Sequence, residues 1–303
     1  MTTALSAATA PATRTRRGPS GLVWTVLRLH RTALVFGGLA LAVASGCLVW
    51  MYAIGDEARR GMGGCAEPVA VEGLPSCASI DAATTDTYTF FIGLLATSLS
   101  FVIFPVAAWS GGALIARELE NGTAQLAWTQ SVTPARWLAA KLAVPAVLLT
   151  TGTGGVALLN LWARQHDGPD LGGDWYYSDV FIVTGPTVVA YPLAGLALGA
   201  LAGLLWRRAL PAAGVGFAAT LLLYNVLERY RADLWPTVTR VEPGGFELPR
   251  SAWQRGWNDG LTRATYHPRS HFWPLQYVET GILLAVAAVA TFAAFRLLRR
   301  RMP

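Results

Sequence analysis

The side chains of this sequence that could carry out chemistry are few, and their spacing disfavours an enzyme. A nucleotide phosphate is commonly held by a Gly-x-x-x-x-Gly-Lys-Ser/Thr loop, but the only lysine, Lys141, follows Leu-Ala-Ala. His267 and His271 have the four-residue spacing of metal ligands on a helix, yet Pro268 lies between them and no third ligand is near. We therefore expect neither a nucleotide site nor a metal site in this chain.

Glu279 is the one acid inside a long apolar segment of the sequence. An acid in such a segment is a functional candidate, because its charge is costly to bury without a partner. Glu279 lies about one helical turn inside the segment's end, so we expect it to pair with an arginine of the preceding connection and to support an outer gate, together with Gln276. The alternative is a contact with a transported substrate.

A polar stretch between two apolar segments, residues 110–141, is the best candidate for binding a partner. Glu118 and Glu120 precede the turn Gly122-Thr123, residues 124–130 can form a short helix, and Thr133-Pro134 is typical of a helix start. Two carboxylates at an exposed corner could meet basic groups of a partner, and glycine permits a tight turn. The alternative is purely structural: Gly122 caps a helix, Glu118 ends it in solvent, and Arg136 and Trp137 anchor the chain at a membrane interface.

Six long apolar segments must position these residues. Each reaches or approaches the ~20 residues that span a membrane as a helix, and none contains Lys, Arg or Asp. With 53% hydrophobic and 14% charged residues, the chain is unlike an ordinary soluble domain. The segments are residues 33–54, 88–109, 142–162, 180–206, 209–227 and 275–295.

The arginines indicate how the segments are oriented. They gather before the first segment, in alternate connections and after the last segment, which makes that side cytoplasmic and places both termini there. We expect outer loops at 55–87, 163–179 and 228–274. The last of these carries seven arginines, and we assign it outside because long loops follow the charge rule less strictly. The net charge of +6 follows from this topology, so no nucleic-acid partner is expected.

The flanking segments give further expectations. Residues 1–20 have the composition of a disordered cytoplasmic tail rather than a cleaved signal peptide, and residues 21–303 form one six-span domain. Residues 21–32 suit either a helix lying in the membrane interface or an extension of the first span. Cys65 and Cys77 share an outer loop and are candidates for a disulfide, with two free thiols as the alternative.

The second and fourth spans contain prolines and glycines that affect how their helices bend and pack. Pro105 predicts a kink in the second span, loosened further by Gly111-Gly112. Gly185-Pro186 and Tyr191-Pro192 predict a broken outer half of the fourth span. The fourth span also has a glycine on every fourth residue, which lets another helix approach one of its faces. That partner is a helix of the same chain or of a second copy. The glycines are Gly195, Gly199 and Gly203.

Several of these motifs resemble the ABC-2 type transporter permeases, particularly the actinobacterial kind. The resemblance rests on Arg-Glu-x-Glu-x-Gly-Thr from Arg117, on Trp-Thr-Gln-Ser-Val-Thr-Pro-x-Arg-Trp-x-x-x-Lys ending at Lys141, and on Leu-Trp-Arg-Arg-Ala-Leu-Pro-Ala from Leu205. It is supported by Phe-Trp-Pro-Leu-Gln-Tyr-Val-Glu-Thr-Gly from Phe272 and by the terminal arginines, and it covers most of residues 21–301.

The resemblance implies an all-α, six-span transmembrane domain of an ABC exporter in the cell membrane. In such permeases the loop between spans 2 and 3 carries a coupling helix that docks on a separate ATPase subunit, which binds the ATP and Mg. A second permease copy, giving a homodimer, and membrane lipid are the other partners, and the 228–274 loop is expected to contain a short helix near 251–262. The coupling residues carried over by position are Arg117, Glu118, Glu120, Gly122, Thr123, Gln130, Arg136 and Trp137.

Two other function classes fit less well. A secondary transporter driven by an ion gradient generally needs ionisable groups at mid-membrane or inverted repeats, and neither is evident. An intramembrane enzyme needs catalytic groups within the spans, yet all four histidines lie in flanks or loops. Spans without free charge favour a lipophilic or neutral cargo, such as a drug, an antibiotic or a lipid-like molecule.

Overall fold

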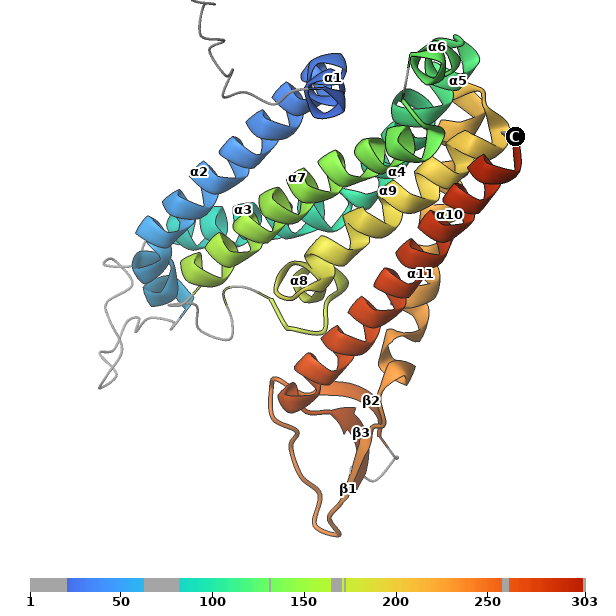
Figure 1. Cartoon of the computed structure of the whole chain (residues 1–303). Coiled ribbons are helices and arrows are strands. Elements are labelled where there is room, and N and C mark those ends of the chain that lie inside the picture. The colour runs from blue at the N-terminus through green and yellow to red at the C-terminus, as the bar shows by residue number, and fades with distance from the viewer. Residues whose placement is uncertain are drawn as a thin grey trace, which may run out of the picture.

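The apolar segments fold as long helices that run side by side, and a small sheet lies at one end of them (Figure 1). This computed structural model describes residues 21–62, 82–130, 132–164, 171, 173–257 and 262–301. Within that part of the chain, six helical stretches are long and apolar enough to cross a membrane, as the sequence predicts. They are Arg31–Arg60, Ala83–Glu120, Pro134–Ala163, Thr187–Trp206, Ala209–Leu234 and Arg269–Arg300.

The first two spans differ in regularity. Helix α1 (Leu22–Leu29) is followed by a turn at His30 and by the long helix α2 (Arg31–Met62), and the two run in different directions (Figure 1). The second span is segmented into α3 (Ala82–Ser100), α4 (Ile103–Trp109), the π-helix η2 (Ser110–Ala116) and α5 (Arg117–Glu120). The expected irregularity is therefore present. Proline at position 105 falls in the first turn of α4, where its missing N–H is tolerated.

The remaining helices begin and end at the residues that local rules indicate. The short helix α6 (Thr123–Thr129) follows Gly122, whose φ of 72° is left-handed, and α7 (Pro134–Ala163) begins with the Thr133 hydroxyl accepting the Arg136 N–H. The predicted break of the fourth span occurs at Gly185-Pro186, which separates α8 (Ser178–Val183) from α9 (Thr187–Trp206). Tyr191-Pro192 does not break the span, because Pro192 lies inside α9. Two further long helices are α10 (Ala209–Tyr230), continued by the 3-10 turn η3 (Arg231–Leu234), and α11 (Phe272–Arg301), preceded by η4 (Arg269–His271).

Helix α9 is the centre of the bundle. It packs against α4, η2, α7, α10 and α11. In its apolar 18-residue stretch 72% of the residues are buried, compared with 11% in that of the first span. The glycine face is filled by the second span of the same chain, since a Cβ on Gly199 would lie 2.2 Å from the Ala107 carbonyl oxygen. Added Cβ atoms on Gly195 and Gly203 would each come within 2.7 Å of a backbone oxygen there. This close approach favours packing within the chain over contact with a second copy.

The connection between the last two spans contradicts an all-α fold. Instead of a helix near 251–262, it forms an antiparallel sheet in the order β1-β3-β2. The strands are β1 (Val238–Val241), β2 (Trp253–Trp257) and β3 (Arg263–His267), with Thr239 opposite Thr265 and Gln254 opposite Tyr266. Tryptophan, threonine and tyrosine favour strands. The ring of Trp253 packs on that of His267 on the neighbouring strand, with 5.4 Å between the ring centroids.

The sheet lies at the opposite end of the bundle from α1, α6 and the end of α11 (Figure 1). Both described ends of the chain are thus at the end that carries α5 and α6, as six crossings require. The expected tail at 1–20 and the cysteine pair Cys65 and Cys77 lie outside the described residues. Cys47, within the first span, has a free thiol.

Candidate functional site

The corner between the second and third spans is held by Glu118, at the end of α5. The indole Nε1 of Trp137 donates to Glu118 Oε2 at 3.0 Å, and Lys141 forms an ion pair with Oε1. The Lys141 and Glu118 side chains are 5% and 14% exposed. Glu118 therefore points inward. The interpretation of residues 110–141 as an exposed corner had assumed that it points outward, toward a partner. Trp137 and Lys141 present one face of α7 to Glu118 because they are four residues apart.

His30 completes this cluster from the N-terminal side. Its Nε2 lies 3.3 Å from Lys141 Nζ, and its ring meets the edge of Trp109 at 5.2 Å between centroids. Burial, and then the neighbouring ammonium of Lys141, lower the pKa of His30 to about 4, although Glu118 acts in the opposite direction. The ring is thus neutral near pH 7 and accepts the lysine's hydrogen bond. His30 was not singled out from sequence. It caps the end of α1, four residues after Val26, and both of these side chains are buried.

Glu120 makes a second link across the corner. Its Oε2 accepts the backbone N–H of Ala209 at 2.8 Å, at the first residue of α10. A carboxylate is stabilised there by the unpaired N–H groups and the dipole of the helix start. The side chains of Glu118 and Glu120 therefore connect α5 to the third span and to the fifth. This link between segments 89 residues apart could not be read from local sequence.

The outward face of the corner is supplied by α6. Ala124 is buried, whereas Gln125, Thr129 and Leu126 are exposed, Leu126 to 60%. The Thr123 hydroxyl donates to the Glu118 carbonyl at 3.2 Å and joins α6 to α5, and the Trp128 ring meets Trp137 at 5.6 Å. Of the remaining predicted coupling residues, Arg117, Gly122, Gln130 and Arg136 are exposed at or beside this face.

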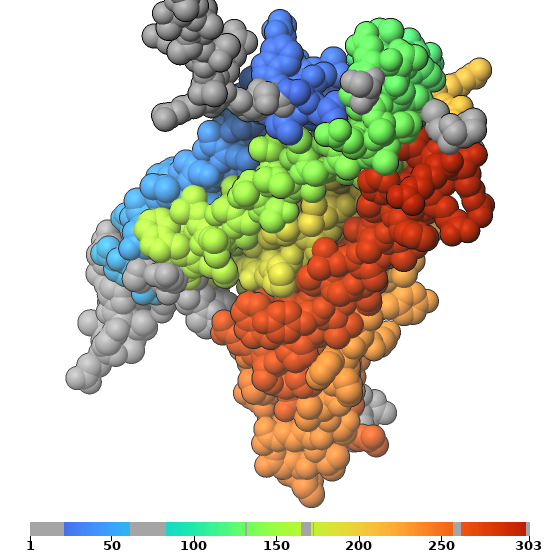
Figure 2. Space-filling view, in the orientation of Figure 1, coloured from blue at the N-terminus to red at the C-terminus, as the bar shows by residue number. Residues whose placement is uncertain are grey.

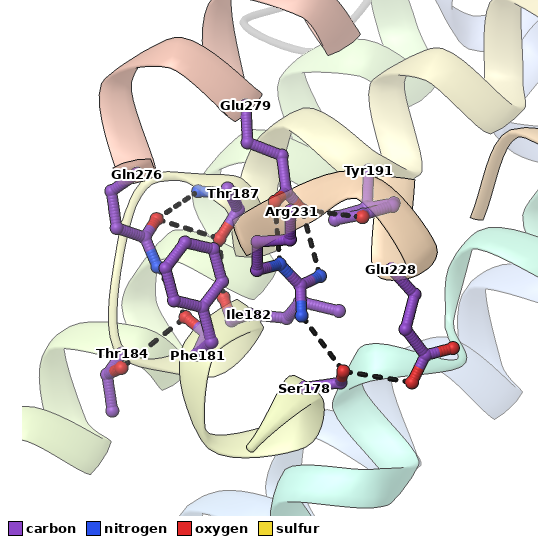
Figure 3. Close-up of polar contacts among 10 residues, drawn as sticks. All are labelled: Ser178, Phe181, Ile182, Thr184, Thr187, Tyr191, Glu228, Arg231, Gln276 and Glu279. Carbon is purple, nitrogen blue, oxygen red and sulfur yellow. Dashed lines mark hydrogen bonds and ion pairs between the residues drawn. The ribbon is translucent and has the colours of Figure 1, made fainter. Parts of the chain in front are cut away.

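A buried polar network lies toward the sheet end, where α9, α10 and α11 meet (Figure 3). Arg231 binds Glu279 through two nitrogens, at 2.7 Å and 3.1 Å, and the side chains are 2% and 0% exposed. The Tyr191 hydroxyl donates to Glu279 at 2.6 Å, and Arg231 donates to the Ser178 hydroxyl at 2.9 Å. The Arg231 guanidinium also lies 4.6 Å from the centre of the Phe181 ring. Glu279 thus has the arginine partner that its position predicts.

Gln276 bridges the break between α8 and α9, one turn before Glu279 (Figure 3). Its amide nitrogen donates to the Phe181 carbonyl, and its oxygen accepts from the Thr187 hydroxyl at 2.9 Å and from the Thr187 N–H at 3.5 Å. A Cβ on Gly185 would lie 2.2 Å from that oxygen, so only glycine leaves room. A break in an apolar environment needs such partners for its freed backbone groups. The two gate candidates therefore belong to one polar layer.

His267, on β3, and His271, in η4, form a pair of contacting rings. Among the described residues no three His, Cys, Asp or Glu side chains lie close enough to hold one. His267 and His271 are close, with their Nδ1 atoms 3.1 Å apart, and the His267 Nε2 lies 2.9 Å from the Ala232 carbonyl oxygen. Burial lowers the pKa of His267, which favours a neutral ring in this contact.

Comparison with known proteins gives one match. The family model described as ABC-2 membrane transporter related matches residues 36–231, which include the second, third and fourth spans in full, most of the first and fifth, and the whole α5–α6 corner. No curated protein and no solved structure matches this chain.

Proposed function

The chain belongs to the family of ABC-2 related membrane transporters, and from this membership we propose that it is the permease subunit of an ABC exporter. Family membership and six apolar helices make it a multi-pass membrane protein and a transport subunit of a generally non-catalytic kind. The proposal adds that a separate ATPase subunit binds ATP and Mg, and that a second copy of this chain completes the transport pathway. Both termini are assigned to the cytoplasm.

The observation that carries the proposal is the construction of the α5–α6 corner. Its outer face exposes Leu126 among polar side chains, which suits insertion into a cleft of another protein. Its inner side is tied to α7 through Glu118 and to α10 through Glu120. A movement imposed on α6 is therefore transmitted to two other spans rather than absorbed by a flexible loop.

The proposed mechanism is rigid-body rocking of the spans. ATP binding in the partner draws α6 inward, and the Glu118 and Glu120 links carry α7 and α10 with it. The spans then exchange an inward-open state for an outward-open one, as in other alternating-access transporters. In this account the Arg231–Glu279–Tyr191 contacts close the outer end in the state described here.

The cargo is proposed to be lipophilic or neutral. Among the described residues, the buried charged side chains are Lys141, Arg231 and Glu279, and each is paired with an opposite charge within the chain. The spans offer apolar and aromatic surface, such as Phe90, Phe101 and Phe217, which are 63%, 44% and 43% exposed. Such surface suits drugs, antibiotics or lipid-like molecules.

Co-purification with candidate ATPase subunits tests the proposal. Leu126→Arg places a charge on the exposed face of α6, while Leu210→Arg, at a residue 84% exposed at the start of α10, is the matched control. We expect the wild type and the control to retain the ATPase and Leu126→Arg to lose it. A chain that binds no ATPase yet moves solute in liposomes under an ion gradient would instead be a secondary transporter.

A further inference from the structure

A long groove runs along the face of the bundle between α7 and α11, with α9 as its floor (Figure 2). Its volume is about 1170 Å³, above the usual range for small-molecule pockets. The groove is deep because alanines line all three helices, among them Ala143 on α7, Ala197 on α9 and Ala288 on α11. A ligand in it would meet hydrocarbon surface along most of its length.

One end of the groove is strongly basic. Arg296, Arg299 and Arg300 line it on the last turns of α11, at the end of the bundle that also carries α6. In the part of the chain that the structure describes, none of the three forms an ion pair. Three unpaired cations at the mouth of an apolar channel are complementary to an anion with an apolar body.

The dimensions match one leaflet of a bilayer. On α11 the apolar part of the lining runs from Leu284 to Arg296, which is ~18 Å of helix at the usual rise per residue. Half of a hydrocarbon core is ~15 Å thick. An acyl chain that starts beside Arg296 therefore ends near the middle of the membrane.

A second copy of this chain fits the groove less well. Its charge partner would have to be a carboxylate at the same end of the bundle, where the described acids are Glu118 and Glu120. Both are already bound within the chain, to Lys141 and to the start of α10. The charge complementarity therefore favours lipid over protein.

We propose that this groove binds an anionic phospholipid of the arginine-side leaflet, with its phosphate at Arg296, Arg299 and Arg300 and its acyl chains between α7 and α11. Basic pockets between membrane helices bind anionic headgroups in this manner. The bound lipid fills the space between helices that pack on α9 but hardly on each other. The proposal does not depend on an ATPase partner or on the nature of the cargo.

Lipid binding is measured by native mass spectrometry of the full chain in detergent, titrated with phosphatidylglycerol or phosphatidylcholine. The test variant changes all three arginines to Gln, and the control changes Arg207 and Arg208 to Gln at the same end but outside the groove. We expect tighter retention of phosphatidylglycerol, weakened roughly fivefold for each groove arginine removed and unchanged in the control. Ala288→Trp, which fills the groove without changing its charge, is also expected to weaken binding.

Four results would overturn the proposal. The first is equal retention of the two lipids by the wild type, and the second is a preference for phosphatidylglycerol that survives in the triple variant. The third is competition by millimolar inorganic phosphate as effective as that by the lipid, which would indicate a site for a soluble anion. A dimer mass that is lost in the Ala288→Trp variant would assign the groove to a second copy of the chain.

Discussion

At the scale of single residues, the buried charged groups of the bundle are organised in pairs that join helices. Glu118 holds α5 against α7 with both carboxylate oxygens, and Glu279 holds Arg231 and Tyr191 at the other end. Sequence reasoning found Glu279 because charges are rare in apolar segments, and Glu118 because it lies in a polar stretch between two such segments. It placed Glu279 beside an arginine but directed Glu118 outward, because the position of Lys141 behind it depends on how α7 packs.

Breaking the Arg231–Glu279 pair is expected to be costly. Arg231→Met leaves a fully buried carboxylate without its counter-ion, which typically destabilises a protein by about 3–5 kcal/mol. Adding Glu279→Gln removes the orphaned charge, so the double variant should recover part of the loss. Thermal unfolding of the purified chain in detergent measures both. Equal losses in the single and the double variant would show that the pair is not coupled as described.

The stability of the chain should depend on the protonation of His30. The pKa is about 4 in the folded chain and about 6.5 in an unfolded one. Above pH 6.5 the ring is neutral in both states, whereas between pH 6.5 and 4 the unfolded state binds a proton that the folded state does not. Stability is therefore expected to fall as the pH drops through this window.

The check on this pH dependence is the variant His30→Gln. Its thermal midpoint, compared with that of the wild type from pH 7 to pH 5, should fall less steeply. Other titrating groups are common to both proteins, so only the difference between the curves is diagnostic. Parallel curves would mean that His30 is solvated and not buried against Lys141 and Trp109.

At the scale of elements, small residues on α9 decide how closely the second span can approach. A methyl group on Gly199 would lie 2.0 Å from the Ser110 hydroxyl and 2.2 Å from the Ala107 carbonyl oxygen, whereas one on Gly214 of α10 meets nothing within 4 Å. We expect Gly199→Ala to destabilise the chain by about 1–3 kcal/mol and Gly214→Ala to be neutral. The yield of monodisperse protein and its thermal midpoint compare the two, and equal behaviour would contradict the packing described.

The broken fourth span depends on one side chain from another helix. Gln276→Leu removes the acceptor of the Thr187 N–H and the nearer donor to the Phe181 carbonyl, which keeps only the Thr184 hydroxyl at 3.4 Å. An unsatisfied buried group costs about 1–3 kcal/mol. Faster amide exchange at residues 181–187 is therefore expected, measured by hydrogen–deuterium exchange. Gln276→Glu keeps an acceptor for Thr187 but loses the donor, so its exchange should be intermediate. Unchanged exchange in Gln276→Leu would show that the break is satisfied in another way.

At the scale of the whole molecule, the features that could be predicted are those that neighbouring residues determine. Hydrophobic runs gave six spans, and the Thr133 cap, the Gly122 turn and the Gly185-Pro186 break obey rules that need only neighbouring residues. The sheet at 238–267 was missed because an all-helical expectation outweighed the strand preference of Trp253 and Thr265. The Glu120–Ala209 contact and the role of His30 depend on packing between distant segments, which no local pattern encodes.

The proposed transport depends on coupling to an ATPase through the α5–α6 corner. Its most direct test is the rate of ATP hydrolysis by a candidate ATPase in lipid vesicles, alone and with this chain as wild type, Leu126→Arg or Leu210→Arg. We expect stimulation by the wild type and by Leu210→Arg, and loss of stimulation with Leu126→Arg. Equal stimulation by all three forms would contradict coupling through α6, and no stimulation by any of them, together with solute movement under an ion gradient, would contradict the assignment as an ABC permease.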